Sequence, residues 1–443
     1  MHNSKFIIQN SKFKIQNLII LADDITGAAE VAGAAAARGY RVRLVCGGDN
    51  ASLPEEEPEA NIITVIATDM RSMTADEAIT ETRRIAALLR PVGESAVGES
   101  AIPSQTSPSL WEGRGRVVRE GLIIKTDSAL RGHVVPILTT LMHTLGYQRA
   151  VYLPANPSKG RIIRNGIYYV EGTPIHETAF SYDPEFPAHT SCLKERFPEA
   201  QDSGIIMPDA ESREDIIRVI EHYTSTSTLF AGAADLIDAL LTPHPNPLPR
   251  RGSSGEADSS PFTLHSSLFT SPRGGSGWGC LFLCGSTQSK PPHIGIPITE
   301  MPQSVYNGST ELEEWKREAG DLYQKEGSLI ITLPPVNVPV SVPVSIPVGE
   351  SAIPSQTPSS LAHHLREMTA ALIHHLVAIR MPHYLILEGG ASAFAALRHL
   401  GWNKLEVISQ LAPGVNLSKA PNGTFVIMKP GSYPWGQALS VEH

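Results

Sequence analysis

Two adjacent carboxylates, Asp23 and Asp24, end the apolar run 18–22 and precede a pattern of small residues that predicts a helix over 28–38. An apolar strand followed directly by a helix is typical of the start of an α/β domain, where ligands bind at the carboxyl edge of the sheet. Two neighbouring carboxylates are costly unless a metal, a cation or substrate hydroxyls use them. We therefore interpret the pair as functional, with simple helix capping by Asp24 as the alternative.

Polar segments also follow three further predicted strands of the N-terminal half. If these strands share a sheet, their charged side chains lie along one edge. Carboxylates accept sugar hydroxyls, and an arginine fork binds a carboxylate through two parallel hydrogen bonds, so the pattern suits a small polyhydroxy acid. A solvated loop charge or a cap explains any one residue but explains the recurrence less well. The residues of this edge are Asp23, Asp24, Arg71, Lys125, Asp127, Arg131 and Arg161.

Glycine-containing turns mark the C-terminal half. Residues 389–392 (Gly-Gly-Ala-Ser) lie between a predicted strand and a predicted helix, and 285–289 follows another apolar strand. Main-chain amides of such turns bind phosphate, aided by the helix N-terminus. Residues 429–433, after the last predicted strand, can add a main-chain contact. The sequence contains neither a P-loop motif nor Gly-x-Gly-x-x-Gly, which argues against a P-loop NTPase and a Rossmann dehydrogenase.

Strand and helix patterns alternate along the chain. This alternation predicts an α/β fold of two domains with largely parallel sheets flanked by helices, interrupted by disordered insertions. The predicted strands are 18–22, 42–46, 62–67, 122–125, 150–153, 281–284, 329–333, 384–387 and 424–428. Besides 28–38, the predicted helices are 75–90, 133–146, 211–223, 362–380 and 391–400.

Several tracts lack the apolar content that a packed core needs, so we expect them to be disordered. Residues 3–10 are nearly repeated at 10–17, and words of 91–106 recur at 347–357, in a manner that resembles short genomic repeats read in frame. A proline-rich docking ligand is the alternative. The predicted organisation is an appended repeat at 1–17, a first domain at 18–242 with an insertion at 91–116, a disordered insertion at 243–279, and a second domain at 280–443 with an insertion at 335–358.

The composition bears on partners and location. The 443 residues are 41% hydrophobic and carry a net charge of −9, which gives no electrostatic reason to expect nucleic acid or an anionic membrane as a partner. No run approaches the roughly 18 apolar residues that span a bilayer. The N-terminus lacks the apolar segment of a signal peptide, and the four cysteines are scattered, so we expect a cytoplasmic protein.

Taken together, these motifs resemble those of the four-carbon acid sugar kinase family, whose members phosphorylate erythronate, threonate and 3-oxo-tetronates with ATP. The resemblance covers nearly all of the chain outside the insertions. In that family the N-terminal domain holds the sugar acid and the C-terminal domain holds the nucleotide. The motifs that carry it are 22–28 (Ala-Asp-Asp-Ile-Thr-Gly-Ala), Arg71-Ser72, 125–132 (Lys-Thr-Asp-Ser-Ala-Leu-Arg-Gly), 157–161 (Pro-Ser-Lys-Gly-Arg), 166–172, 174–178 and Asp183-Pro184.

The resemblance implies roles for individual residues, with ATP and Mg²⁺ as cofactors and a small sugar acid as the partner. It leaves a homodimer open and identifies no metal ligand. The implied sugar-acid contacts are Asp23, Asp24, Arg71, Asp127, Arg131 and Gly132. The implied nucleotide contacts are Ser286, Gly389, Gly390, Ala391, Ser392 and Gly431.

The expected reaction is phosphoryl transfer from ATP to the terminal hydroxyl of the acid. Asp24 is the preferred base that orients or deprotonates this hydroxyl, and Asp127 is the other candidate. Arg71 and Arg131 would hold the substrate carboxylate.

Departures from the family pattern leave alternatives. Glu30 and His133 stand where the family usually has Asp and Asn, and the turn after the two glycines carries Ala391-Ser392 instead of an acid and Thr. A degenerate kinase that binds a sugar acid without phosphoryl transfer is therefore the main rival. A phosphatase with an aspartate nucleophile fits poorly, because Ile25 and Thr26 do not supply the second carboxylate.

Overall fold

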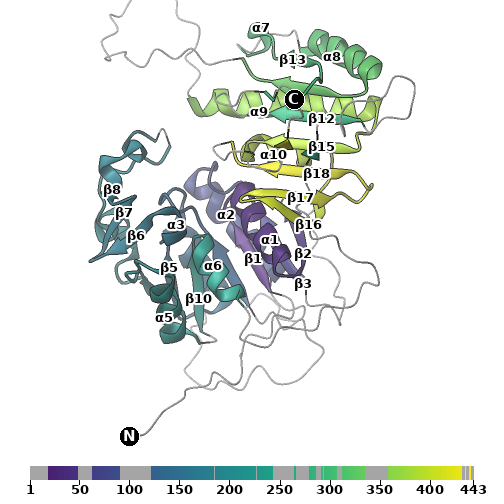
Figure 1. The fold of residues 1–443 in the computed structure, drawn as a ribbon. Helices are drawn as coiled ribbons and strands as arrows, with labels where there is room; N and C mark the ends of the chain where they lie inside the picture. The colour runs from purple at the N-terminus through teal and green to yellow at the C-terminus, as the bar shows by residue number, and fades with distance from the viewer. Residues whose placement is uncertain are drawn as a thin grey trace, which may run out of the picture. The chain divides into compact units, whose positions relative to one another are not determined.

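The computed structural model describes the chain in two compact units (Figure 1), and the predicted appended repeat and insertions lie almost entirely outside the described residues. We call Met1–Asp23, Ala51–Ile66 and Met70–Pro249 the N-terminal unit, and Asp24–Asn50, Ala67–Asp69 and Arg250–His443 the C-terminal unit. The described residues are 18–47, 62–89, 121–183, 185–225, 227–242, 264–265, 279–285, 291–292, 294–306, 312–334, 358–431, 435 and 439–440.

The N-terminal unit contains a sheet in the order β3-β1-β4-β10-β5-β9, in which β1, β4, β10, β5 and β9 are parallel. Helices α2 and α3 pack together, and so do α5 and α6. A small antiparallel sheet, β6-β7-β8, follows β5. The strands are β1 (Ile19–Ala22), β3 (Ile62–Ala67), β4 (Leu122–Lys125), β5 (Arg149–Leu153), β6 (Arg161–Arg164), β7 (Ile167–Val170), β8 (Thr173–Pro174), β9 (Ile205–Ile206) and β10 (Thr228–Gly232). The helices are α2 (Ala75–Leu89), α3 (Val134–Leu145), α4 (Leu193–Arg196), α5 (Arg213–Tyr223) and α6 (Ala234–Leu241), with short 3₁₀ turns at Pro157–Lys159, Ile175–Glu177, Ala179–Tyr182 and Pro198–Ala200.

The register of this sheet brings the carboxyl ends of its central strands level. Ala22 of β1 pairs with Lys125 of β4, and Gly232 of β10 pairs with both Lys125 and Leu153 of β5. Strands β1 and β10 are buried along their full length, as expected for parallel strands covered on both faces. The residues that follow β1 and β4 therefore emerge at one edge.

The C-terminal unit contains a mixed sheet in the order β13-β14-β12-β15-β18-β17-β16-β2. Strands β13, β14, β12, β15 and β18 are parallel to one another. Strands β18, β17, β16 and β2 pair antiparallel, each with the next. The strands are β2 (Arg41–Cys46), β12 (Cys280–Cys284), β13 (Ile298–Glu300), β14 (Leu329–Thr332), β15 (Tyr384–Glu388), β16 (Lys404–Ala412), β17 (Val415–Lys419) and β18 (Phe425–Lys429), and β11 (Leu264–His265) pairs separately with β19 (Leu439–Ser440). The helices are α1 (Ile25–Ala37), α7 (Gln303–Tyr306), α8 (Leu312–Glu326), α9 (Pro358–Ile379) and α10 (Gly390–His399).

Helix α1 packs on β16 and β17 because its residues are small. A Cβ at Gly33 would lie 1.7 Å from Asn416 Oδ1, so only glycine allows this approach. Asn416 Nδ2 donates to the carbonyl oxygen of Ala29 over 2.7 Å, which fixes the strand against the helix. The small-residue pattern of 28–38 therefore reflects close packing.

The predicted α/β fold with largely parallel sheets is confirmed, and each of the nine predicted strands is present within one or two residues. Strand β10, between β4 and β5, and the antiparallel strands β16 and β17 were not predicted. Residues 24–50 group with the C-terminal unit, whereas the predicted first domain ran from 18 to 242; the predicted domain boundaries stay predictions. Among the described helices, none is long and apolar enough to cross a membrane.

Candidate functional site

Asp23 and Arg71 form a two-pronged ion pair at the carboxyl edge of the N-terminal sheet. Arg71 Nε lies 3.2 Å from Asp23 Oδ2, and Nη2 lies 2.8 Å from Oδ1. The Arg71 amide also donates to the Asp23 carbonyl oxygen. Asp23 is 4% exposed, and a charge this buried needs such a partner.

Asp127 forms a second two-pronged pair with Arg131. Arg131 Nε and Nη2 each lie 3.0 Å from an oxygen of the Asp127 carboxylate, which also accepts the Ala129 amide over 2.8 Å. Arg71 Nη1 is 3.7 Å from Asp127 Oδ1 and thereby joins the two pairs. We call Asp23, Arg71, Asp127 and Arg131 the charge cluster; the sequence predicted all four at one edge, and the structure brings them together.

The charge cluster keeps Asp127 ionised. Burial would raise the pKa of this carboxyl, but the guanidinium charge of Arg71 and the hydrogen bond and charge of Arg131 outweigh burial and hold the pKa well below its usual range. The pKa of Arg131 is raised in return, since its bond to Asp127 offsets the cost of burial. Asp127 is therefore a poor proton acceptor near neutral pH.

The loop after Asp127 depends on unusual backbone geometry. Leu130 is buried with a φ of 61°, and Gly132 has a φ of 94°, a conformation that favours glycine. A Cβ at Gly132 would lie 3.2 Å from Asp23 Oδ2, so the glycine also lets the loop approach the cluster. Gly132 thus has a clear structural role beside its predicted contact with substrate.

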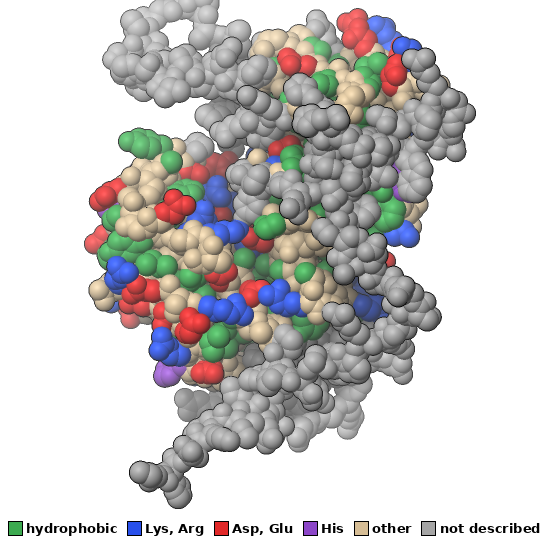
Figure 2. Space-filling model, in the orientation of Figure 1, with side chains coloured by type: hydrophobic (Ala, Val, Ile, Leu, Met, Phe, Trp, Pro, Cys, Tyr) green, Lys and Arg blue, Asp and Glu red, His purple; other side chains and the backbone are tan. Residues whose placement is uncertain are grey.

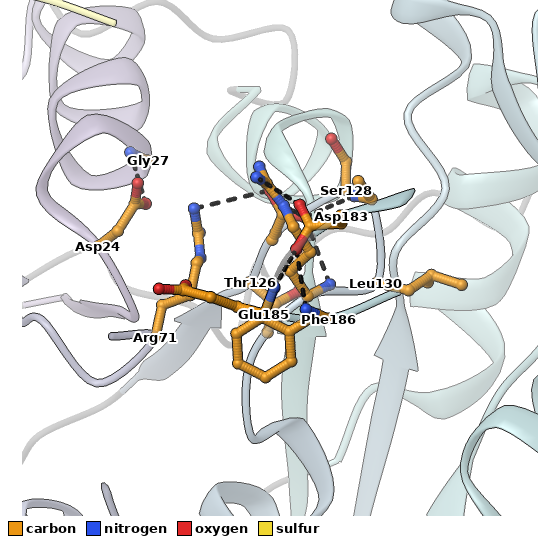
Figure 3. Close-up of polar contacts among 12 residues, drawn as sticks. Asp24, Gly27, Arg71, Thr126, Ser128, Leu130, Asp183, Glu185 and Phe186 are labelled. Atoms are coloured by element: carbon orange, nitrogen blue, oxygen red, sulfur yellow. Dashed lines mark hydrogen bonds and ion pairs between the residues drawn. The ribbon is translucent and has the colours of Figure 1, made fainter. Parts of the chain in front are cut away.

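Asp183 joins the cluster from a distant loop. Its Oδ1 accepts the amides of Glu185 and Phe186 over 3.1 and 2.8 Å, and its Oδ2 lies 3.6 Å from Arg131 Nη1 (Figure 3). The Phe186 ring then packs edge-on against His133. Asp183 was noted only as part of a motif and was not among the predicted contacts.

A small recess of about 10 Å³ lies beneath the cluster. Asp23, Thr126 and His133 line it together with apolar side chains of β4 and α3. Its volume suits about one water-sized group. The recess is therefore too small to be the binding pocket of a sugar acid.

Asp24 belongs to the C-terminal unit and caps helix α1. Its carboxylate accepts the Gly27 amide over 2.9 Å (Figure 3) and the hydroxyl of Thr26. Capping, the alternative interpretation of this residue, is thus present; it does not test the predicted catalytic role. The two adjacent aspartates have separate partners in separate units.

The glycine turn of the C-terminal unit, residues 389–392, lies where three neighbouring parallel strands, β12, β15 and β18, end. The Gly285 amide donates to the Glu388 carbonyl, and the Gly389 amide donates to the Lys429 carbonyl, each over 2.9 Å. Gly389 has a φ of 96° and precedes α10. Ser392 Oγ donates to the Gly285 carbonyl over 3.3 Å, so this predicted nucleotide contact serves the turn itself.

The N-terminus of α10 has main-chain groups that can bind a phosphate. Its first amides have no acceptor within the helix, as at every helix start, and the helix dipole favours an anion there. A Cβ at Gly390 would lie 2.5 Å from Thr26 Cγ2, so the helix start is glycine because α1 packs closely against it. A turn of this kind can bind a phosphate group.

A buried ion pair lies directly under this turn. Lys429 Nζ is 2.6 Å from Glu388 Oε1, and the two side chains are 2% and 4% exposed. Lys429 also donates to the Pro430 carbonyl over 2.9 Å and lies 5.4 Å from the centre of the Trp435 ring. This pair was not predicted from the sequence, although each residue is a charge that ends an apolar strand.

The remaining predicted positions have the following places. Ala391 lies in the first turn of α10, and Gly431 follows β18, its carbonyl 3.5 Å from Lys429 Nζ. Ser286 lies outside the described residues. Within the described ranges, no three His, Cys, Asp or Glu residues gather as metal ligands would.

On the face drawn in Figure 2, acidic and basic side chains of the N-terminal unit are interleaved.

Comparison with known proteins supports the family resemblance of the sequence motifs. A family model described as a sugar-binding N-terminal domain matches residues 18–101 and 109–203, which include the whole charge cluster and Asp183. Curated relatives named as erythronate, threonate and 3-oxo-tetronate kinases match parts of the chain. These matches support the resemblance of the chain to the four-carbon acid sugar kinase family.

The curated relatives of this kinase family are distant. The chain is 29% identical over 183 residues to a D-erythronate kinase of Heliobacterium modesticaldum, covering 40% of this chain and 35% of the relative. It is 25% identical over 252 residues to a D-threonate kinase of Salmonella typhimurium, covering 50% of this chain and 53% of the relative. The aligned part thus spans between about a third and half of the length of these relatives.

Solved structures share the fold over a greater length. A Salmonella typhimurium LT2 protein superposes with a TM-score of 0.61 at 16% identity, covering 94% of this chain and 96% of its own. A Haemophilus influenzae protein of the DUF1537 family gives a TM-score of 0.54 at 17% identity, covering 94% and 97%. At these identities the likeness concerns the fold alone.

Proposed function

We propose that this protein is an ATP-dependent kinase that phosphorylates a four-carbon sugar acid on its terminal hydroxyl. The observation that carries the proposal is the charge cluster, built from buried carboxylate–guanidinium pairs within the part of the chain that matches a sugar-binding domain. Relatives named erythronate and threonate kinases, which match 40% and 50% of this chain, support it as well.

The charge cluster suits hydroxyl recognition because its carboxylates are held in place and Asp127 is held ionised. A carboxylate oxygen has two lone pairs, so Asp127 Oδ1, which among the described residues accepts one hydrogen bond, from Arg131 Nη2, can also accept a substrate hydroxyl. Arg71 and Arg131 fix the orientation of the two acids. This pre-organisation favours a small ligand rich in hydroxyls.

The nucleotide is assigned to the glycine turn at the start of α10. The amides of Gly390, Ala391 and Ser392 would hold phosphate oxygens, with the helix dipole adding to the attraction. Mg²⁺ bound with the nucleotide would neutralise charge on the transferring phosphoryl group. The assignment is of the main chain, and the side chains Ala391 and Ser392 are not required for it.

Asp24 is proposed as the base and Asp127 as a positioning residue. Asp24 caps α1, and Thr26 of the same helix packs against Gly390, so this carboxylate belongs to the unit that carries the glycine turn. Asp127 is unsuited to proton transfer because its arginine partners hold its pKa far below neutral.

A coupled ADP-release assay over a panel of tetronates and 3-oxo-tetronates tests the proposal. We expect ATP- and Mg²⁺-dependent turnover with at least one member and none with the matching polyols. A chain lacking 91–116, 243–279 and 335–358 should retain that turnover if these insertions are passengers. Calorimetric binding of a tetronate without any binding of ATP–Mg²⁺ would instead indicate a degenerate kinase.

A further inference from the structure

The arginines near the charge cluster differ in the protein groups that their guanidinium groups already contact. The forks of Arg71 and Arg131 each face a carboxylate of the protein. A guanidinium engaged in this way cannot offer the same two N–H groups to a substrate carboxylate.

Arg196 is engaged differently. Its guanidinium donates to the main-chain carbonyls of Leu130, Phe186 and Pro187, and burial lowers its pKa. These bonds tie together the two loops that flank the cluster. Arg196 is therefore part of the scaffold.

Arg161 has a different environment. Its Nη1 donates to Ser128 Oγ, and its guanidinium lies 5.3 Å from the centre of the Phe180 ring. Among the described residues, no carboxylate lies within ion-pair distance of Arg161, and Nε and Nη2 have no hydrogen-bond partner. A half-buried cation with no protein anion beside it attracts one from solution.

The position of Arg161 is fixed relative to the cluster. Ser128 directly follows Asp127, and its carbonyl accepts the hydroxyl of Tyr168, whose ring is buried. Arg161 itself opens β6 after Gly160, which has a φ of 64°. The open edge of this guanidinium is thus held at the same end of the sheet as Asp23 and Asp127.

We infer that Arg161, rather than Arg71 or Arg131, binds the carboxylate of the sugar acid. This inference rests on the proposed function and refines it. Arg71 and Arg131 then position Asp23 and Asp127, whose oxygens accept the hydroxyls. The arrangement makes Arg161 the residue that separates an acid from the neutral polyol of the same length.

Ligand-observed NMR and calorimetry on the full chain test this with two probes, erythronate and erythritol, which differ by a carboxylate in place of one hydroxymethyl group. We expect the unmodified protein to prefer erythronate. Arg161→Gln should weaken erythronate binding by about 10- to 100-fold, the scale of a charge-assisted pair, and leave erythritol binding unchanged. Ser128→Ala removes the neighbouring hydroxyl but keeps the charge, so it should retain the preference.

Arg161→Lys is the second variant if Arg161→Gln fails to fold. It keeps the charge without the fork, so an intermediate preference for the acid is expected. If the folded Arg161→Gln protein keeps the full preference for erythronate, the inference is overturned and the kinase proposal stands. The same holds if Arg161→Lys keeps the full preference while the separate variant Arg131→Gln abolishes it. Failure of the unmodified protein to bind or turn over any tetronate would instead refute the proposed function.

Discussion

The two units use the carboxyl ends of parallel strands in opposite ways. In the N-terminal unit, β1 and β4 end level and are followed by Asp23 and Asp127, whose charges stay at the sheet edge with Arg71 and Arg131. In the C-terminal unit, β15 and β18 also end level, but their last residues, Glu388 and Lys429, pair with each other with side chains only 4% and 2% exposed, whereas the side chains of Arg71 and Arg131 are 14% and 34% exposed.

The difference shows what each edge presents to a ligand. Beyond the buried pair, the C-terminal unit offers the first main-chain amides of α10, those of Gly390, Ala391 and Ser392, because the amides of Gly285 and Gly389 already donate to carbonyls of the protein. The N-terminal unit offers charged side chains. Main chain suits a phosphate, which every nucleotide carries, whereas side chains can discriminate among small polyols and acids.

The largest expected effect concerns Asp23 and Asp24, which are adjacent in the sequence but belong to different units. Asp24→Asn should lower ATP-dependent turnover by about 100- to 10,000-fold, the usual contribution of a general base. Asparagine is as good an N-cap as aspartate, so the fold and the melting temperature should change little. Steady-state ADP release with circular dichroism checks both.

Asp24→Ser is the matched control for the cap, since serine also caps but cannot act as a carboxylate base. It should be as inactive as Asp24→Asn. Turnover within a few-fold of the unmodified enzyme in either folded variant would leave Asp24 with the cap alone.

The second test removes the buried charge of the C-terminal unit. Lys429→Met should lower the free energy of unfolding by about 3–5 kcal/mol, because it breaks a buried ion pair by taking away one partner. Urea unfolding measures the loss. Lys316→Met breaks a surface pair with Glu313 on α8 and should cost less than about 1 kcal/mol; equal losses would show that burial does not set the cost of breaking the Glu388–Lys429 pair.

The third test removes a charge from the N-terminal unit. Asp127→Asn should lower the free energy of unfolding by about 2–3 kcal/mol at pH 7, less than Lys429→Met because Arg131 is partly exposed to solvent. Asp183→Asn removes only a longer contact to Arg131 and should cost less than about 1 kcal/mol.

The stability difference between Asp127→Asn and the unmodified protein should depend on pH. The folded-state pKa of Asp127 is depressed, so its stabilising effect is complete above the unfolded pKa of about 3.9 and is lost as pH falls toward the folded pKa. Urea unfolding at pH 7, 5 and 3 should therefore show a constant difference at pH 7 and 5 and a smaller one at pH 3. A constant difference across all three would mean that the charge of Asp127 is not what stabilises the fold.

The sequence was enough to place the charge cluster but not to pair it. Carboxyl ends of parallel strands meet at one edge, so the polar residues after β1 and β4 could be expected together. Which guanidinium faces which carboxylate depends on the register of the strands and on the loop through Leu130, and neither can be read along the chain. The sequence assigned Arg71 and Arg131 to the substrate; the structure shows that both also bind protein carboxylates, and their contact with substrate stays a prediction.

The strands and the ion pair that were not predicted have weaker sequence patterns, or patterns on which no prediction was based. Strand β10 is five residues long, and its apolar run ends at Gly232, whose lack of a side chain admits the Leu153 carbonyl. Strand β16 begins with alternating exposed and buried residues, the period-2 pattern of a half-exposed strand, so that element was predictable. The pair of Glu388 and Lys429 required the register of β15 with β18 before it could be recognised.

The smallest expected effect concerns the main chain of the glycine turn. Gly390→Ala places a Cβ 2.5 Å from Thr26 Cγ2, closer than real contacts allow, so the start of α10 or the Thr26 side chain must shift. Overpacking of this kind costs about 1 kcal/mol or somewhat more, partly offset by the better helix propensity of alanine. If the amides of this turn hold the nucleotide, ATP affinity should fall several-fold while erythronate affinity stays unchanged, as calorimetry can measure.

The double variant Gly390→Ala with Thr26→Ser separates packing from chemistry. Serine keeps the hydroxyl that bonds to Asp24 but removes Cγ2, the atom that the new Cβ would meet. ATP affinity should therefore recover, and Thr26→Ser alone should be nearly neutral. A loss of ATP affinity that Thr26→Ser does not relieve would show that the clash is not the cause, and equal losses for ATP and erythronate would mean that this turn does not distinguish the two ligands.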